Sequence, residues 1–203
     1  KLGELLRAFP DGSRRVRWFF GDERWVDRES KESNEGMIRA ALLAPLNIPE
    51  DHVYSWQAGT GSPIAKARQY EEILKEHFES EHKYPDLLVL GMGEDGHTAS
   101  LFPDGWAMRG GAPDPTRDAM PMSPNLPGFT AAVYAPGTQS FRLTMTAAFL
   151  KRSRRIFFLV SGANKRQTLS RVLKGDSELP ASWMNLDQTR FLVTRDAVDT
   201  ERI

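Results

Sequence analysis

The sequence predicts an α/β domain in which helices cover a largely parallel sheet. Short apolar runs rich in β-branched and aromatic residues alternate with longer amphipathic stretches, and several of the runs are bounded by glycine. Such alternation is typical of layered α/β domains. A continuous apolar run is what a strand covered on both faces requires, as in parallel sheets under helices. With 203 residues and no internal repeat, the chain is expected to form a single domain over residues 1–203.

Strands are predicted where the apolar runs lie. The first run, residues 15–20, reads RVRWFF, and the second, residues 87–90, is fully apolar. The remaining candidates are residues 130–134, 141–145, 156–160 and 191–194.

Helices are predicted between these strands. Ser62 and Pro63 form a start signal, a capping hydroxyl followed by proline at the first helical position, and apolar residues recur at near-helical spacing beyond them. Residues 33–43 give another helix, and residues 164–174 give a third, with Gly175 as its C-terminal cap.

One segment lacks both periodicities. Residues 104–128 are rich in Pro, Gly, Asp and Met, with predicted strands on either side. We expect a long surface loop there, within the same domain.

Composition excludes several classes of function. The 27 Lys and Arg balance the 27 Asp and Glu, so no net positive charge would attract nucleic acid or an anionic membrane surface. The chain has no cysteine, and therefore no disulfide, no thiolate nucleophile and no Cys-ligated zinc. Its apolar runs are far shorter than the ~20 residues that span a bilayer. We expect a soluble, cytosolic domain.

Polar residues gather at strand exits, which is where ligands bind in open α/β sheets. After the first strand, Asp22, Glu23 and Arg24 are predicted to leave the sheet within one turn, and the arginine could fork onto a phosphate or carboxylate. After the strand at 156–160, Lys165 stands at a helix start, where free backbone N–H groups and the helix dipole favour an anion. The alternatives are a solvated charged turn and a solvent-facing lysine.

The most specific pattern follows the run at 87–90. Residues 91–103 read GMGEDGHTASLFP, and the glycines let the backbone bend tightly and approach a ligand. The turn delivers Asp95 and His97 to the edge of the sheet. An imidazole has an unperturbed pKa of ~6.5 and can act as a general base near neutral pH. A structural turn with an incidental histidine is the alternative, but the Asp-Gly-His combination directly after a buried strand favours a function.

Covalent hydrolysis has no obvious nucleophile in this chain. No serine lies in a G-x-S-x-G elbow and no thiol is present. What remains is a general-base mechanism on a phosphorylated or carboxylated small molecule.

Together these segments resemble the 6-phosphogluconolactonase family. The matching segments are residues 21–24 (GDER), 33–34 (SN), 90–103, 142–146 (RLTMT) and 162–165 (GANK). The resemblance implies the three-layer α/β/α sandwich shared with glucosamine-6-phosphate deaminase and ribose-5-phosphate isomerase. It implies hydrolysis of 6-phosphoglucono-δ-lactone to 6-phosphogluconate in the oxidative pentose phosphate pathway. It also implies a cytoplasmic enzyme, monomeric or homodimeric, that needs no metal or organic cofactor.

The resemblance also implies roles for individual residues. His97 matches the general base that draws a proton from water as it attacks the lactone carbonyl. Asp95 and Asp22 match positions that orient the base and the sugar, and Arg24 and Lys165 match the phosphate-binding pair. The further substrate-binding positions are Asn34, Gly96 and Arg142.

The chain departs from the family pattern at its start. The family's N-terminal strand and Gly-Gly-Ser/Thr phosphate loop do not appear, and residues 1–5 (KLGEL) look like the helix that follows that loop. We therefore expect a lactonase domain that is N-terminally incomplete relative to the family.

Two other functions remain open. A glucosamine-6-phosphate deaminase or isomerase would need a base and a ring-opening acid, for which His97 and Asp22 could serve, although GHTASLFP and Arg24 look lactonase-like. A sugar-phosphate-binding regulator would keep the fold without catalysis, and loss of the base would be its signature, yet His97 is present.

Overall fold

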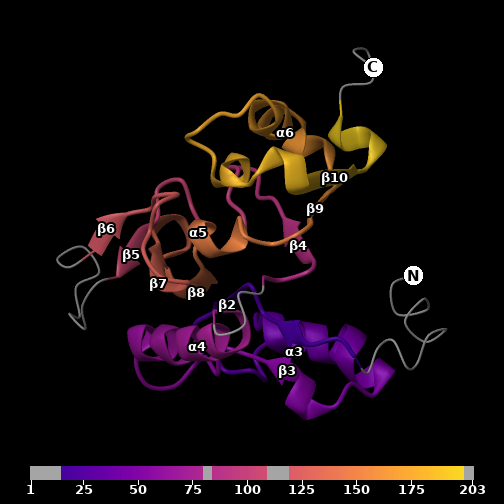
Figure 1. Ribbon diagram of the computed structural model, residues 1–203. Helices are drawn as coiled ribbons and strands as arrows, with labels where there is room; N and C mark the ends of the chain where they lie inside the picture. Colours follow the sequence, from indigo (N-terminus) through magenta and orange to yellow (C-terminus); the bar gives the residue numbers. More distant parts are fainter. Residues whose placement is uncertain (1–14, 80–83, 109–118, 199–203) are drawn as a thin grey trace.

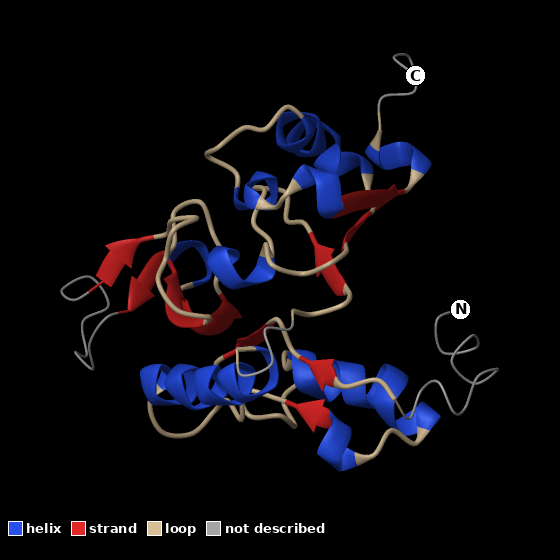
Figure 2. Ribbon diagram, in the orientation of Figure 1, coloured by secondary structure: helices blue, strands red, loops and turns tan. Residues whose placement is uncertain are grey.

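The computed structural model describes residues 15–79, 84–108 and 119–198. The helix expected at residues 1–5 lies outside these ranges. Within these ranges the strands form three sheets, two of them parallel and one antiparallel, and helices pack around them (Figures 1 and 2). The predicted α/β class is confirmed.

The parallel sheets contain most of the strands predicted from apolar runs. Strand β1 (Trp18–Phe19) pairs with β3 (Val53–Tyr54). In the second sheet β9 (Ile156–Val160) lies between β4 (Leu88–Gly91) and β10 (Thr189–Val193). Because β4 and β9 are parallel neighbours, the segments that follow their carboxyl ends begin side by side (Figure 1).

The third sheet is antiparallel and has the strand order β2-β8-β7-β5-β6. Its strands are β2 (Asp22–Arg24), β5 (Trp106–Met108), β6 (Ala119–Pro121), β7 (Thr130–Ala135) and β8 (Ser140–Met145).

The helices are α3 (Asn34–Ile38), α4 (Pro63–Phe78), α5 (Ala147–Leu150) and α6 (Arg166–Leu173). Helix α3 continues into a π-helical turn, Arg39–Leu43. The helix and this turn together correspond to the helix predicted at 33–43. Short 3-10 turns lie at Ala44–Leu46, Glu50–His52, Pro136–Thr138, Ala163–Lys165, Pro180–Trp183, Leu186–Gln188 and Arg195–Ala197. Gly175 follows α6 with a φ of 77°, as its predicted capping role requires.

Three local predictions are corrected. Asp22, Glu23 and Arg24 do not leave the sheet; they form β2, because the backbone of this charged segment pairs with β8. Residues 104–128 are not one loop, since β5 and β6 pair there and extend the sheet of β7. Ser62 stands at the N-cap of α4, but its side chain makes no capping hydrogen bond.

One continuous core joins the sheets and helices. Along β9, Ile156, Phe158 and Val160 are almost fully buried, as expected for alternate residues of a strand. Helix α4 is fastened to the antiparallel sheet where Thr130 Oγ1 donates to the carbonyl of Ala67, at 2.8 Å.

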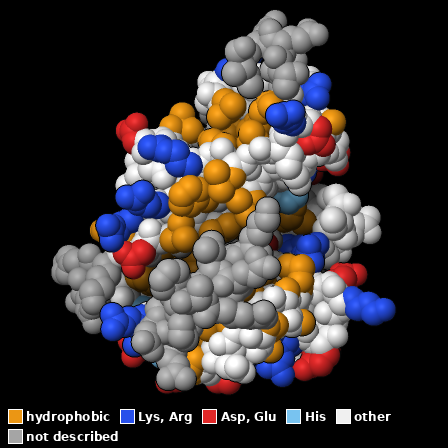
Figure 3. Space-filling model, turned by 90° about the vertical axis from the view of Figure 1, so that its right-hand side faces the viewer, with side chains coloured by type: hydrophobic (Ala, Val, Ile, Leu, Met, Phe, Trp, Pro, Cys, Tyr) orange, Lys and Arg blue, Asp and Glu red, His pale blue; other side chains and the backbone are white. Residues whose placement is uncertain are grey.

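One face of the β4-β9-β10 sheet carries exposed apolar side chains. Val89, Leu159 and Leu192, one from each strand, are 52%, 51% and 55% exposed. Hydrophobic side chains gather on this side of the molecule in Figure 3.

Candidate active site

The loop that follows β4 folds back on itself through its own backbone. The N–H of Gly93 donates to the carbonyl of His97 at 2.9 Å, and the N–H of Gly96 donates to the carbonyl of Gly93 at 3.2 Å. Gly96 has a φ of 81°, in the region that favours glycine, and its carbonyl accepts from the N–H of Ala181 at 3.0 Å. The loop therefore presents His97 at a fixed place beside the end of β4.

Gly93 is required because a side chain at this position would collide with the side chains of His97 and Asp95. A Cβ at this position would lie 2.2 Å from His97 Nδ1 and 2.5 Å from Asp95 Oδ1. Any larger residue would displace these two side chains. The glycines of this loop thus make room for the histidine as well as bending the chain.

Asp95 and His97 form a hydrogen-bonded pair. Asp95 Oδ1 lies 2.6 Å from His97 Nδ1 and also accepts the backbone N–H of His97 at 3.1 Å. Partial burial acts to raise the pKa of Asp95, but the hydrogen bonds from His97 outweigh it and hold the pKa below its usual range. An ionised carboxylate can only accept, so the proton of the neutral imidazole lies on Nδ1 and the lone pair on Nε2. His97 is then arranged to take a proton through Nε2.

The His97 ring is neither buried nor free to turn. Its side chain is 35% exposed, and it packs on the ring of Phe102 with centroids 4.7 Å apart. The ring is therefore held in place while remaining open to a small molecule or water.

Ser100 connects this loop to the antiparallel sheet. Its buried hydroxyl donates to Asp22 Oδ2 at 2.7 Å, and its N–H donates to Thr144 Oγ1 on β8 at 3.3 Å. Residues more than 70 positions apart are thereby joined, and the predicted strand exits at Asp22 and His97 are brought together. Ser100 lies inside the motif of residues 91–103, yet nothing in the sequence singled it out as the link.

Asp22 occupies a different environment from Asp95. Asn34, the first residue of α3, donates its side-chain amide to both the backbone carbonyl and Oδ1 of Asp22, at 3.3 Å each. Burial raises the pKa of Asp22, although the Ser100 hydrogen bond opposes the shift. Asp22 is thus protonated more readily than an ordinary aspartate.

Arg24 and Arg142 face each other across β2 and β8, where they are directly paired in the register. Burial and the charge of Arg24 lower the pKa of Arg142. Like charges opposite one another destabilise a sheet, and among the described residues neither arginine forms an ion pair. Arg24 instead donates to the carbonyl of Glu32 at 2.5 Å. The pair is suited to an anion, which would neutralise both charges.

The segment after β9 is tied to the loop after β4, as the parallel pairing of the two strands predicts. Lys165 Nζ donates to the carbonyl of Met92 at 2.6 Å, and Thr168 Oγ1 donates to the carbonyl of Glu94 at 2.6 Å. Asn164 also donates to the Glu94 carboxylate. Lys165 thus groups with the His97 loop, and within the described ranges it forms no hydrogen bond or ion pair with Arg24.

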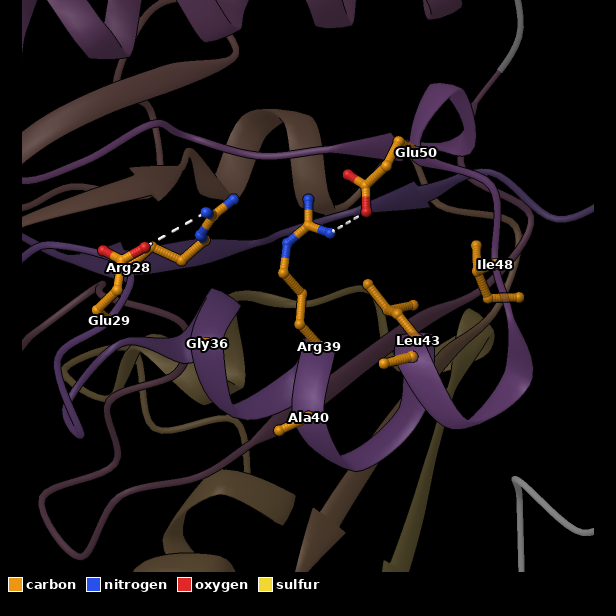
Figure 4. A pocket seen from close by; sticks show the side chains of 9 residues that line it. Arg28, Glu29, Gly36, Arg39, Ala40, Leu43, Ile48 and Glu50 are labelled. Atoms are coloured by element: carbon orange, nitrogen blue, oxygen red, sulfur yellow. Dashed lines mark hydrogen bonds and ion pairs between the residues drawn. The ribbon is translucent and has the colours of Figure 1, made fainter.

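A separate pocket of about 460 Å³ lies between α3, its π-helical extension and the segment around Glu50 (Figure 4). Arg39 reaches into it and pairs with Glu50 at 2.7 Å. None of the predicted site residues line this pocket.

The described residues show neither a metal cluster nor a membrane span. Over residues 15–79, 84–108 and 119–198, no group of three or more His, Asp or Glu could hold a metal ion. In the same ranges, no helix is long and apolar enough to cross a membrane.

Residues 4–193 match the sequence profile of the glucosamine-6-phosphate isomerase/6-phosphogluconolactonase family. The chain belongs to this family. A 6-phosphogluconolactonase of a Nostoc strain is 34% identical over 161 residues, which cover 78% of this chain and 60% of that protein. One from a Synechocystis strain is 33% identical over 167 residues, 81% of this chain and 62% of that protein.

The fold agrees with the sequence comparison. The crystal structure of 6-phosphogluconolactonase from Thermotoga maritima superposes with a TM-score of 0.70 at 26% identity, covering 89% of this chain and 73% of that one. The match thus spans about 60% of the length of the two cyanobacterial relatives and a larger share of the solved structure.

Proposed function

We propose that this chain hydrolyses 6-phosphoglucono-δ-lactone to 6-phosphogluconate, with His97 as the general base. The observation that carries the proposal is the Asp95–His97 pair, which leaves Nε2 as a proton acceptor. The relatives named 6-phosphogluconolactonase support the choice of substrate. The partner is accordingly a small sugar-phosphate lactone, and we expect a cytoplasmic enzyme that is a monomer or a homodimer.

In this mechanism His97 Nε2 takes a proton from a water molecule as the water oxygen attacks the lactone carbonyl. The carboxylate of Asp95 stabilises the imidazolium that forms, because it is negatively charged and accepts a hydrogen bond from the N–H at Nδ1. When the C–O bond of the ring breaks, the proton on Nε2 passes to the leaving ring oxygen, which becomes a hydroxyl. The products are the carboxylic acid and the free base, ready for another turnover.

The two arginines of the site are proposed to bind the phosphate group of the substrate. Arg24 and Arg142 present two guanidinium groups from neighbouring strands, and a phosphate can accept hydrogen bonds from both. Lys165, Asn34 and Gly96 remain proposed substrate contacts. Holding the substrate by its phosphate would place the lactone carbonyl within reach of His97 and supply the orientation that hydrolysis needs.

The raised pKa of Asp22 supports one other candidate, a glucosamine-6-phosphate deaminase or isomerase. A carboxyl group that is readily protonated suits acid–base work on a sugar ring. Such chemistry would need Asp22 as a second acid–base group beside His97, whereas in the lactonase mechanism His97 alone moves the proton.

The test is lactone hydrolysis, with the spontaneous rate subtracted, for the chain and two variants. His97→Ala is expected to lower kcat by ~10²–10⁴-fold, because general-base catalysis contributes about that much. His52→Ala is the matched control, since His52 lies in a 3-10 turn outside the site and should leave the rate unchanged. Full activity in His97→Ala would rule out the base, and deaminase turnover without lactonase turnover would favour the second candidate.

A further inference from the structure

Glu23 is a buried carboxylate on β2, the strand that also carries two proposed site residues. It is 2% exposed and lies between Asp22 and Arg24 on β2. Side chains alternate between the two faces of a strand, so Glu23 points away from the face that carries Asp22 and Arg24. A buried carboxylate is costly unless hydrogen bonds satisfy it. Here the satisfaction comes from α3.

Both oxygens of Glu23 accept hydrogen bonds from the start of α3. Oε1 accepts the backbone N–H groups of Arg24 and Asn34, at 2.8 and 2.7 Å. Oε2 accepts the backbone N–H of Glu35 at 2.7 Å and the hydroxyl of Ser33 at 3.1 Å. Backbone N–H groups at a helix start are free donors that attract negative charge. Glu23 therefore serves α3 as an anionic cap contributed by a distant strand.

The cap leaves no donor free at the helix start. Ser33 accepts the next N–H through its hydroxyl, from Gly36 at 3.0 Å, and the following one through its carbonyl, from Met37 at 3.1 Å. The start of α3 is thus already occupied by the protein's own carboxylate. Its contribution to the site is made through Asn34 rather than through direct binding of a phosphate.

Each of the three residues of β2 forms hydrogen bonds with the segment at 32–35. Asp22 contacts the Asn34 amide, Glu23 holds the backbone, and Arg24 reaches the carbonyl of Glu32. Glu23 links the two segments, because its Oε1 accepts the backbone N–H groups of both Arg24 and Asn34. One carboxylate therefore fixes two of the substrate-contacting positions relative to each other.

We propose that Glu23 is a positioning residue for the reaction, one that sets the Asp22–Asn34 contact and the direction of Arg24 without touching substrate. The proposal rests on the function proposed above. It explains why an acid occupies the middle of β2, where its charge is paired with helix N–H groups and not with either arginine.

The first test replaces the carboxylate by an amide of the same shape. Glu23→Gln must turn an NH2 group towards backbone donors, so the segment at 32–35 should shift. A displacement of about 1 Å can cost ~10²-fold in rate, and we expect kcat/KM for the phosphorylated lactone to fall ~10- to 100-fold. The preference for phosphorylated over unphosphorylated glucono-δ-lactone should fall as well, because Arg24 moves. A merely structural role would leave that preference intact.

Two further variants separate positioning from stability. Met37→Gly weakens α3 at an exposed residue, 58% exposed, without touching Glu23, and should keep both the rate and the preference well below its unfolding temperature. Glu23→Asp keeps the charge but withdraws it by one methylene, so it should fold even if Glu23→Gln does not and should show a smaller loss of the same kind. If Met37→Gly lost the preference equally, or Glu23→Asp kept it fully, the proposal would be overturned.

A measurement without turnover distinguishes this proposal from the lactonase proposal. Amide exchange at Asn34 and Glu35 should accelerate in Glu23→Asp, and affinity for inorganic phosphate should fall. If the unmodified chain shows no lactonase activity but these two changes appear, the function is wrong and the positioning role stands. If the chain is active and neither change appears, the positioning role is wrong and the function stands.

Discussion

The two aspartates of the candidate site, Asp95 and Asp22, have pKa values that their environments shift in opposite directions. Asp95 lies on a glycine-rich loop, half exposed, and the hydrogen bonds from His97 lower its pKa. Asp22 lies on a strand, and burial raises its pKa even though Ser100 donates to it. The first remains charged and can stabilise an imidazolium, whereas the second resists charge. Pairs of carboxylates whose environments separate their pKa values commonly divide the roles of a site.

The two regions also differ in what builds them. Around Asp95, glycines and backbone hydrogen bonds set the geometry, and Gly93 leaves the space that His97 fills. Around Asp22, side chains from β2, α3 and the His97 loop converge, with Glu23 and Ser100 as the links. A loop folded by its own backbone is visible in the sequence, whereas a convergence of side chains is not.

The largest effect that would sharpen this comparison is expected at Asp95. Asp95→Asn can still accept from His97 Nδ1 but carries no negative charge, so the imidazolium loses its stabilisation. We expect kcat to fall on the order of 10²-fold with little change in KM, which steady-state lactone hydrolysis would measure. Asp86→Asn is the control, because Asp86 forms an exposed ion pair with Arg154 and is not among the proposed site residues. A kcat equal in the two variants would remove Asp95 from the mechanism.

A smaller effect is expected at the arginine pair. Arg24→Met removes one of two guanidinium groups that face each other, and we expect KM for the phosphorylated lactone to rise ~10-fold, the scale of one charge-assisted hydrogen bond. KM for the unphosphorylated lactone should change little. Arg28→Met, at an exposed arginine nearby, should alter neither value. Equal losses on both lactones in Arg24→Met would argue against a phosphate role.

How much of the site could be predicted depends on the same distinction between the two regions. The loop after β4 and the segment after β9 follow apolar runs that read clearly as strands, so their place at one sheet edge follows from parallel pairing. Strand β2 could not be predicted, because three charged residues carry no apolar pattern and its pairing with β8 depends on the fold.

The same limit applies to the irregular segment and to the links within the site. Strands β5 and β6 were hidden in residues 104–128 because each is three residues long, too short to show an alternation, and the surrounding segment is rich in Pro and Gly. Glu23 and Ser100 act through partners far along the chain or on another element, which one sequence does not reveal. If the segment had been recognised as a strand, the alternation of side chains would have predicted that Glu23 lies on the opposite face from Asp22 and Arg24.

The smallest expected effect concerns the free energy of unfolding. It tests the comparison of the two aspartates most directly, because their contributions to stability should change with pH in opposite directions. The folded-state pKa of Asp22 is raised above 3.8, so its contribution to stability is full below that pH and is lost as pH rises through the folded pKa. The folded-state pKa of Asp95 is lowered from 3.8, so its contribution is present above that pH and is lost as pH falls through the folded pKa.

Urea unfolding of Asp22→Asn and Asp95→Asn between about pH 2 and about pH 8 would show the two slopes, because the Asp95 slope lies below its unfolded pKa and the Asp22 slope lies above that value. Asp22→Asn should become more stable than the unmodified chain as pH rises, since no charge has to be buried. A gain of about 1 kcal/mol, the scale of a typical single substitution, would raise Tm by ~2–4 °C in a chain of this size. Asp95→Asn should instead be less stable near neutral pH and approach the unmodified chain as pH falls. Parallel pH profiles for the two variants would show that the environments of the two carboxylates do not differ, and the division of roles between them would then have no physical basis.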